Sequence, residues 1–366
     1  SGLMQLLPAI AGQWETGREE IVTQAAQIET IVIHNRQVSE VSSVPPQGVA
    51  DSAFSAFRAS FDADYGGFGT APKFPSPHNL LFLLRYWNAT GEEDALDMVT
   101  STLRAIRCGG IYDQLGFGVH RYSTDREWLV PHFEKMLYDQ ALLSMAFLEA
   151  YGATEDEFFA GTAREILEYV LHDMTSADGA FYSSEDADSE GGEGAFYTWS
   201  HDEMSRILTP GELQAVAGHW NVTESGNFTE AGALNNSRNI LHLTPENCSS
   251  TITSPGELQD VISAARQTLL LSRESRPEPF RDEKVLTDWN GLMIAALARA
   301  SIVLNDPEYL DAAADAFEFI MNSMKNEDQR LFHSFAGGRQ GPEAFLDDYV
   351  FLIWGCLELY SASLQQ

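Results

Sequence analysis

Lysine is scarce in this chain of 366 residues, with only Lys73, Lys135, Lys284 and Lys325. Lys and Arg together number 22, against 54 Asp and Glu, so the formal net charge is −32. A surface this negative repels polyanions, and we therefore exclude nucleic acids and anionic membranes as partners. Such an excess of carboxylates also suits a high-salt cytoplasm, where dissolved ions screen the repulsion between them.

Cysteine and long apolar runs are also scarce. Cys108, Cys248 and Cys356 lie far apart with no Cys-X-X-Cys pair, so we expect three buried thiols, no disulfide framework and no zinc site. The longest apolar run, 350–357, is too short for a membrane span and indicates a buried helix. The sequence starts without a basic segment followed by an apolar one, so we expect no signal peptide and a cytoplasmic location.

Helical patterns dominate what is present, while alternation typical of strands is rare. Several loops combine small turn-forming residues with an aromatic one, which predicts helical hairpins whose loops fold back on one end. Stacked side by side, such hairpins form an all-α (α/α) toroid with short β-hairpins in its loops. The ten helices expected fall short of a six-hairpin ring, so we expect an incomplete toroid. The predicted helices are 17–36, 50–61, 78–90, 94–107, 131–151, 156–174, 258–273, 288–305, 307–323 and 343–364.

Two domains are expected. Residues 1–49 are read as a connecting helix and linker, and residues 50–366 as the partial toroid. The polar segment 221–257 is read as a long loop between helical blocks.

The richest polar segment runs from 109 to 139. Pro131 suits the first position of a helix, and on a helix that begins there His132, Lys135 and Asp139 fall on one face. Burying these groups costs several kcal/mol unless they pair. We interpret the segment as a polar site at the mouth of the toroid, and the alternative is an ion-pair network that holds the loop. The segment also carries Tyr112, Asp113, His120, Arg121 and Trp128.

A second polar segment, 181–199, places Glu185, Asp186 and Asp188 among aromatic residues. Paired carboxylates beside aromatic rings are typical of glycoside chemistry. The alternative is a solvated acidic loop, and the spacing does not match a calcium-binding EF-hand. Lys73, from a glycine-rich segment that does not match a phosphate loop, is expected to line the same mouth.

Two apolar helices open with polar residues, which predicts that these residues share one cavity. Taken singly, each acidic residue among them has the alternative of being only a helix cap. The signatures of serine hydrolases, zincins and dinucleotide sites are missing, and we expect no metal and no cofactor. The polar residues are Asp288, Trp289 and Asn290 in one helix, and Asp347, Asp348 and Tyr349 in the other.

Five segments, 66–75, 109–141, 181–199, 284–298 and 345–353, resemble the thioredoxin-domain-containing family that includes spermatogenesis-associated protein 20. The resemblance implies a thioredoxin-like domain followed by a toroid similar to N-acylglucosamine 2-epimerases and six-hairpin glycosidases. It also implies that further toroid helices follow in full-length relatives. No residue here matches the redox motif, so redox activity does not carry over, and the thioredoxin-like domain is expected as a partner.

We therefore predict a carbohydrate-binding or carbohydrate-active toroid that takes a small-molecule or glycan ligand. In an epimerase-like version, His120 and His132 exchange a proton next to the sugar carbonyl and Arg121 stabilises the enolate oxygen. In a hydrolase version, Glu185 or Asp186 is the general acid and Asp347 or Asp348 the base or nucleophile.

The competing prediction is a non-catalytic module that binds a glycan or a protein and partners the thioredoxin-like domain. The residues assigned to substrate binding, among which Asp347 is also a candidate base in the hydrolase version, are Lys73, Tyr112, Asp113, Trp128, Lys135, Asp139, Asp188, Trp289, Asn290, Asp347 and Tyr349.

Overall fold

The computed structural model describes residues 3–36, 48–229, 237–244, 247–248 and 256–364. The chain divides into two compact units, Ser1–Ser52 and Ala53–Gln366. The first unit contains α1 (Leu3–Arg36), which is kinked at Gly17. Of the predicted loops, 37–49 and 221–257 lie partly outside the described residues. Within the described part of the chain, no helix is both long and apolar enough to cross a membrane.

The described residues form twelve helices, and α7 and α8 were missed by the sequence analysis because they are only 7 and 10 residues long. After α1, the helices are α2 (Val49–Ser60), α3 (Pro77–Thr90), α4 (Glu93–Cys108), α5 (Leu137–Thr154), α6 (Glu157–Asp173), α7 (His201–Ile207), α8 (Pro210–His219), α10 (Glu257–Arg273), α11 (Thr287–Val303), α12 (Pro307–Ser323) and α13 (Leu346–Ser363).

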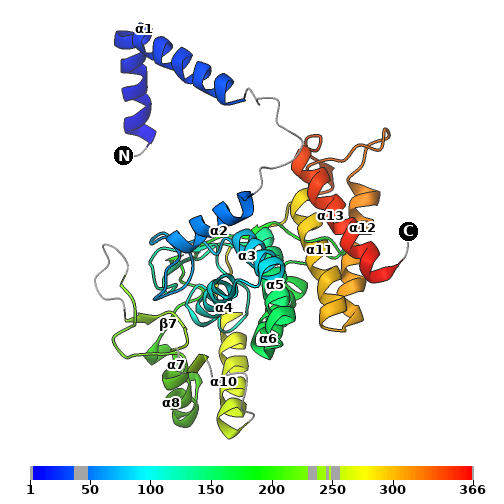
Figure 1. The fold of residues 1–366 in the computed structure, drawn as a ribbon. Helices are drawn as coiled ribbons and strands as arrows, with labels where there is room; N and C mark the ends of the chain where they lie inside the picture. The colour runs from blue at the N-terminus through cyan, green and yellow to red at the C-terminus, as the bar shows by residue number, and fades with distance from the viewer. Residues whose placement is uncertain (1–2, 37–47, 230–236, 245–246, 249–255, 365–366) are drawn as a thin grey trace. The chain divides into compact units, whose positions relative to one another are not determined.

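Four of these helices form a row in the order α3, α5, α11 and α13, each packed against the next. Helices α4, α6 and α12 pack against α3, α5 and α11, so that each pair is a helical hairpin with one inner and one outer helix (Figure 1). Helix α5 is buried on nearly all sides, as a helix with neighbours on both flanks must be. The row is an open arc, which confirms the prediction of an incomplete α/α toroid.

Short antiparallel strands lead into the inner helices. The strand β3 (Lys135–Met136) precedes α5 and pairs with β4 (Ser184–Glu185), which follows α6. In the same way, β10 (Val285–Leu286) precedes α11 and pairs with β11 (Ser334–Ala336), which follows α12. The helical hairpins α5–α6 and α11–α12 are thus each closed at one end by a pair of strands. The other strands are β1 (Tyr122–Ser123), β2 (Pro131–His132), β5 (Asp188–Ser189), β6 (Gly192–Glu193), β7 (Trp199–Ser200), β8 (Arg238–Asn239), β9 (Arg281–Asp282) and β12 (Arg339–Gln340).

The prediction that a helix begins at Pro131 is wrong. Residues 131–136 are extended or irregular, because β2 pairs with β1 and β3 pairs with β4, and α5 begins only at Leu137. His132 and Lys135 therefore do not share a helical face with Asp139. The pattern of apolar residues was compatible with a longer helix, but bonds to distant strands decided the conformation.

The cysteine prediction also needs correction. Cys108 and Cys248 are joined in a disulfide, with their Cα atoms 5.8 Å apart, and Cys356 is the free cysteine among the described residues. The two partners are 140 positions apart in the sequence, so no local spacing signalled the pair.

The helices α7, α8 and α10 form a separate group that packs together beside the arc. From α10, Arg266 donates a hydrogen bond to the carbonyl of Leu115, and Arg273 donates to the carboxylate of Asp113. These contacts fix α10 to the loop that follows α4, and they leave a cavity between α10 and α6.

Candidate functional site

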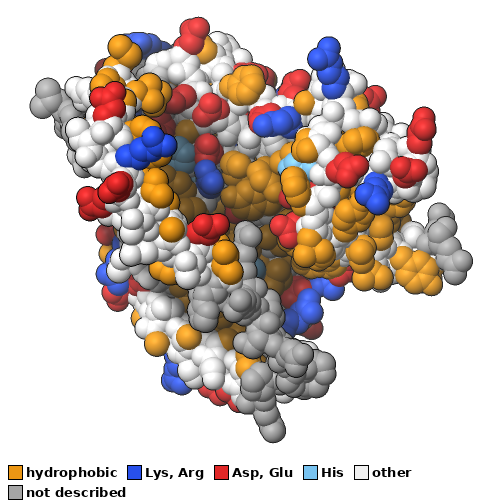
Figure 2. All heavy atoms as spheres, turned by 90° about the horizontal axis from the view of Figure 1, so that it is seen from above, with side chains coloured by type: hydrophobic (Ala, Val, Ile, Leu, Met, Phe, Trp, Pro, Cys, Tyr) orange, Lys and Arg blue, Asp and Glu red, His pale blue; other side chains and the backbone are white. Residues whose placement is uncertain are grey.

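The first turns of α5, α11 and α13 meet at one end of the arc. The rings of Tyr138 and Trp289 pack edge to face, 4.8 Å apart between centroids. The backbone N–H of Asp288 donates to Oδ1 of Asp348 over 3.1 Å. We call this end of the arc the mouth. It comprises the first turns of α5, α11 and α13 and the loop residues bonded to these turns. Figure 2 looks down on the molecule from above and shows a hollow with hydrophobic side chains on its floor and histidine at its sides.

A short repeat marks the mouth: Leu-X-Asp occurs at 137–139, 286–288 and 346–348, at the start of α5, α11 and α13. It places Asp139, Asp288 and Asp348 in the first turns of three neighbouring helices. Negative charge is favoured there by the positive end of each helix dipole. The repeat is present in the sequence but was not among the predicted signals, because its spacings of 149 and 60 residues are unequal and form no period.

His333 and Asp348 form an oriented pair in the mouth. Nδ1 of His333 lies 3.0 and 3.1 Å from the two carboxylate oxygens of Asp348, and it donates if the proton is assigned to that nitrogen. The Asp348 carboxylate is fully buried and also accepts from the backbone N–H of Phe345 over 2.7 Å. The His333 side chain is 27% exposed. The imidazole is thereby held in one orientation with a surface open to solvent, and sequence analysis did not single it out because no motif surrounds it.

Asp139 lies buried at the start of α5. Burial raises the pKa of its carboxyl to about 8, although the nearby Arg121 opposes the shift. Its Oδ2 atom has no hydrogen-bond partner among the described residues. Arg121 itself forms an ion pair with Glu134 at 2.8 Å. At neutral pH, Asp139 is therefore a protonated carboxyl, with the guanidinium of Arg121 as a charged neighbour.

Asp288, His333 and Asp348 are also able to hold a metal ion. One ligand atom from each lies within 4.8 Å of the others. Two carboxylates and one imidazole form a donor set suited to several divalent cations. Burial raises the pKa of Asp288, and the nearby Asp348 carboxylate adds to this effect.

The two histidines proposed as an exchange pair lie in different surroundings. His120 is 1% exposed, its Nδ1 is 3.0 Å from the carbonyl oxygen of Phe133, and burial lowers its pKa to about 3. His132 is half-buried, stacks on Tyr122 and bonds Glu193 through Nδ1 at 2.7 Å. His120 therefore offers no open surface on which to meet a sugar.

Lys135 and Asp113 belong to a buried network. Nζ of Lys135 donates to Asp113 over 2.9 Å, and Arg273 donates to the same carboxylate over 2.8 Å. These two cations hold the pKa of Asp113 far below its usual range, despite burial. The geometry here matches the alternative of an ion-pair network that fixes the loop to α10.

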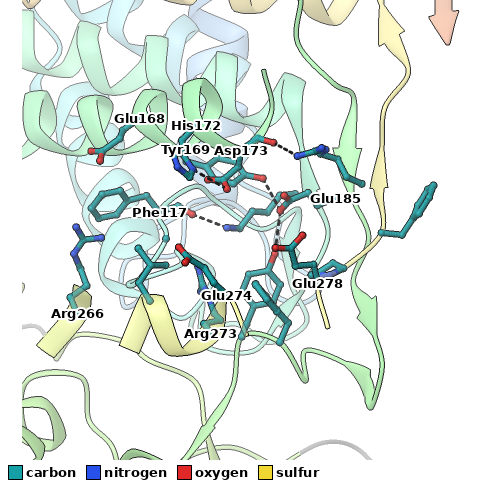
Figure 3. Close-up of a pocket in the computed structure, with 18 of the residues that line it drawn as sticks. Phe117, Glu168, Tyr169, His172, Asp173, Glu185, Arg266, Arg273, Glu274 and Glu278 are labelled. Carbon is teal, nitrogen blue, oxygen red and sulfur yellow. Dashed lines mark hydrogen bonds and ion pairs between the residues drawn. The ribbon is translucent and has the colours of Figure 1, made fainter. Parts of the chain in front are cut away.

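Glu185 lines the cavity between α6 and α10, whose volume is about 870 Å³ (Figure 3). Its Oε2 accepts hydrogen bonds from the hydroxyls of Tyr169 at 2.9 Å and Tyr197 at 3.3 Å. Burial raises the pKa of the Glu185 carboxyl. Asp186, Asp347 and Asp348 are not among the described residues that line this cavity, so it does not bring together the carboxylate pair of the hydrolase prediction.

The other candidate residues either form hydrogen bonds within the protein or lie at the surface. Lys73 is buried against Asp62, under the ring of Trp128, and Tyr112 donates to Glu165. Asn290 bonds the backbone N–H and carbonyl of Phe181. Four further candidates lie at the surface: Asp186, Asp188, Asp347 and Tyr349.

Comparison with known proteins finds no matching family model. Spermatogenesis-associated protein 20 of Homo sapiens is 33% identical over 402 residues, which is 99% of this chain and 51% of that protein. An uncharacterized protein of Caenorhabditis elegans is 33% identical over 98% of this chain and 53% of its own length. The chain spans about half the length of the curated relatives it matches.

Among solved structures, cellobiose 2-epimerase of Spirochaeta thermophila is 15% identical, covers 86% of this chain and 95% of its own, and has a TM-score of 0.35. An unsaturated glucuronyl hydrolase specific for heparin is 12% identical, covers 87% of this chain and 69% of its own, and has a TM-score of 0.49. These likenesses are distant, and the chemistry of this chain rests on its own residues.

Proposed function

This chain is a homologue of spermatogenesis-associated protein 20, and we propose that its mouth performs acid–base chemistry on a carbohydrate ligand. The observation that carries the proposal is the His333–Asp348 pair at the point where three inner helices begin. A carboxylate that fixes one imidazole nitrogen leaves the other nitrogen free to take a proton, as in other carboxylate-oriented general bases.

The proposed reaction is the removal of a proton from the carbon next to the carbonyl of an open-chain sugar. The C–H bond breaks, its proton goes to Nε2 of His333, and its electron pair moves through the new C–C double bond to the carbonyl oxygen. Arg121 supplies positive charge for that oxygen, and the protonated Asp139 supplies a neutral proton donor beside it. Return of the proton to the face it left regenerates the starting sugar, and delivery of a proton to the opposite face of the carbon completes an epimerisation.

Carbohydrate is the ligand class that the remaining side chains suit best. The packed rings of Tyr138 and Trp289 offer apolar surface to the C–H face of a sugar. The carboxylate of Asp288 is an acceptor for sugar hydroxyls at the same end of α11.

The test is deuterium exchange. Glucose, mannose and cellobiose are incubated with the 366-residue chain in D₂O, and loss of the C2 proton signal is followed by NMR. We expect exchange above the uncatalysed rate. His333→Gln should lower the rate at least about 100-fold, because a positioned base contributes 10²–10⁴-fold.

His201→Gln is the matched control, since it makes the same change on α7, outside the mouth. Its exchange rate should equal that of the unmodified chain. No exchange on any of the three sugars, or equal rates for the two variants, contradicts the proposal.

The second candidate function, a binding module without catalysis, is favoured by one observation. Helix α13 exposes an apolar stripe that includes Leu346, Val350, Ile353 and Leu357. An exposed stripe of this kind suits packing against another protein surface. Binding of sugars without any C2 exchange is the outcome that favours this second function.

A further inference from the structure

The cavity between α6 and α10 is a site distinct from the mouth. It is bordered by the last turn of α6, with Tyr169 and Asp173, and by the last turn of α10, with Leu270 and Arg273. Its volume of about 870 Å³ lies in the range of small-molecule sites. His333, Asp348 and Trp289 are not among the described residues that line it, so it goes beyond the proposed function.

Both helices present their C-terminal ends to this cavity. Helix α6 ends at Asp173 and α10 ends at Arg273, and residues from both last turns line the space. A helix C-terminus carries about half a negative charge from its aligned peptide dipoles. Two such ends facing one cavity favour a positive ligand.

Carboxylates add to this negative field. Glu168 comes from α6, and Glu274 and Glu278 come from the segment after α10; Figure 3 shows them on opposite sides of the cavity. Among the described residues, no side chain forms a hydrogen bond or ion pair with these three carboxylates. They remain available to a ligand, unlike the carboxylate of Asp113 behind the wall.

The cations in the wall already have partners within the protein. Lys135 and Arg273 share Asp113, and Arg281 forms an ion pair with Glu283 at 3.0 Å. Arg266 lies over the ring of Phe117 and donates to the carbonyl of Leu115. An anionic ligand would therefore meet free carboxylates and occupied guanidinium groups.

The geometry points to a binding site for a small organic cation, an ammonium group on a hydroxylated or flexible body. The ammonium group lies between the carboxylates of Glu274 and Glu278 and the end of α6. Glu185 and the hydroxyls of Tyr169 and Tyr197 form a polar wall that hydrogen-bonds the rest of the ligand. Amino sugars and polyamines both carry this chemistry.

The experiment compares ligands that differ in charge. Glucosamine, glucose and glucuronate share one ring size, and spermidine represents an amine without a sugar. Binding of each to the full chain is measured by calorimetry at neutral pH. We expect an amine to bind at least about tenfold more tightly than glucose, and glucuronate most weakly, since close contacts with carboxylates attract an ammonium group and repel a carboxylate.

A double variant locates the binding. Glu274→Gln with Glu278→Gln should weaken amine binding about tenfold or more and leave glucose unchanged. The matched control, Glu308→Gln with Asp311→Asn on α12, removes the same net charge from an exposed surface and should have little effect. Preference for spermidine over glucosamine assigns a polyamine, and the reverse assigns an amino sugar.

Three results overturn the inference: no binding of either amine, equal affinity for glucosamine, spermidine and glucose, or equal effects of the two double variants. None of them bears on deuterium exchange at the mouth, so failure of this inference and failure of the proposed function are separable.

Discussion

At the scale of single residues, the buried carboxylates divide into two groups according to their neighbours. Asp62 and Asp113 have direct cation partners that lower their pKa values. Asp139 and Glu185 have no such direct ion pair among the described residues, and burial raises their pKa values. The first group holds loops in place, while burial without a paired cation disfavours the charged form of the second group.

Asp139 makes the stability of the chain depend on pH. Its folded pKa of about 8 exceeds the unfolded value near 4, so the folded state binds an additional proton between these pH values. The stabilisation is complete below about pH 4 and is lost as pH rises through about 8. Asp139→Asn removes this titration. Between pH 5 and 9 we therefore expect the free energy of unfolding of the variant to fall by a few kcal/mol less than that of the unmodified chain.

Urea unfolding at several pH values measures this effect. Asp97→Asn, on the exposed face of α4, is the matched control and should leave the pH dependence unchanged. If the free energy of unfolding depends on pH in the same way for Asp139→Asn and the unmodified chain, the pKa of this carboxyl is not raised by folding.

Lys73 is a structural rather than a catalytic lysine by its contacts. Its ammonium group donates to Asp62 and to the carbonyls of Gly66 and Arg126, all within 2.8 Å, and the side chain is fully buried. Lys73→Met leaves these acceptors underpaired, so we expect a loss of about 3 kcal/mol in the free energy of unfolding. Urea denaturation measures it.

The exposed pair of Arg58 and Asp94 gives the contrast, since both side chains are about half-exposed or more. Arg58→Met should cost less than about 1 kcal/mol. Equal costs for the two substitutions would contradict the structural role of Lys73.

At the scale of elements, two inner helices are tied to the preceding hairpin by the same device. The amide of Gln140, in the first turn of α5, bonds both the N–H and the carbonyl of Val119. The amide of Asn290, in the first turn of α11, bonds both groups of Phe181. Each side chain thus acts as one more residue of a strand and fixes the start of the helix that carries mouth residues.

Removing either side-chain amide leaves a buried backbone N–H and a buried carbonyl without their hydrogen-bond partner. We expect Gln140→Leu and Asn290→Leu each to lower the free energy of unfolding by about 2–4 kcal/mol. Asn88→Leu, at an exposed position of α3, is the control and should change it by less than about 0.5 kcal/mol. Chemical denaturation gives both values, and a cost for Asn290→Leu no larger than the control would show that the amide is not needed.

The same elements show how far the sequence leads. The helix at 307–323 was predicted with the bounds that α12 has, because Asp306 and Pro307 signal its start. The start of α5 was misplaced, because Pro131 gives the same signal in a segment that instead pairs with β1. Local signals are reliable where no distant strand competes for the backbone.

At the scale of the whole molecule, charge is the dominant property. The net charge of −32 means that negative side chains repel one another in the compact state. Dissolved salt screens this repulsion, with a screening length of about 10 Å at 0.1 M. We therefore expect the thermal midpoint to rise when NaCl increases from 0.05 to 1 M. Calorimetry measures it, and sucrose at matched osmolality is the control. If the thermal midpoint does not rise in NaCl, or rises equally in sucrose, the high-salt interpretation is wrong.

The sequence alone determined the helical class, the acidic surface and the polar first turns of apolar helices, because each depends on composition or on neighbours within a few residues. Only the tertiary structure decided which of these groups meet. The contacts of Tyr138 with Trp289 and of His333 with Asp348 join separate helical hairpins or loops. Such contacts depend on the packing of whole helices, which no local pattern encodes.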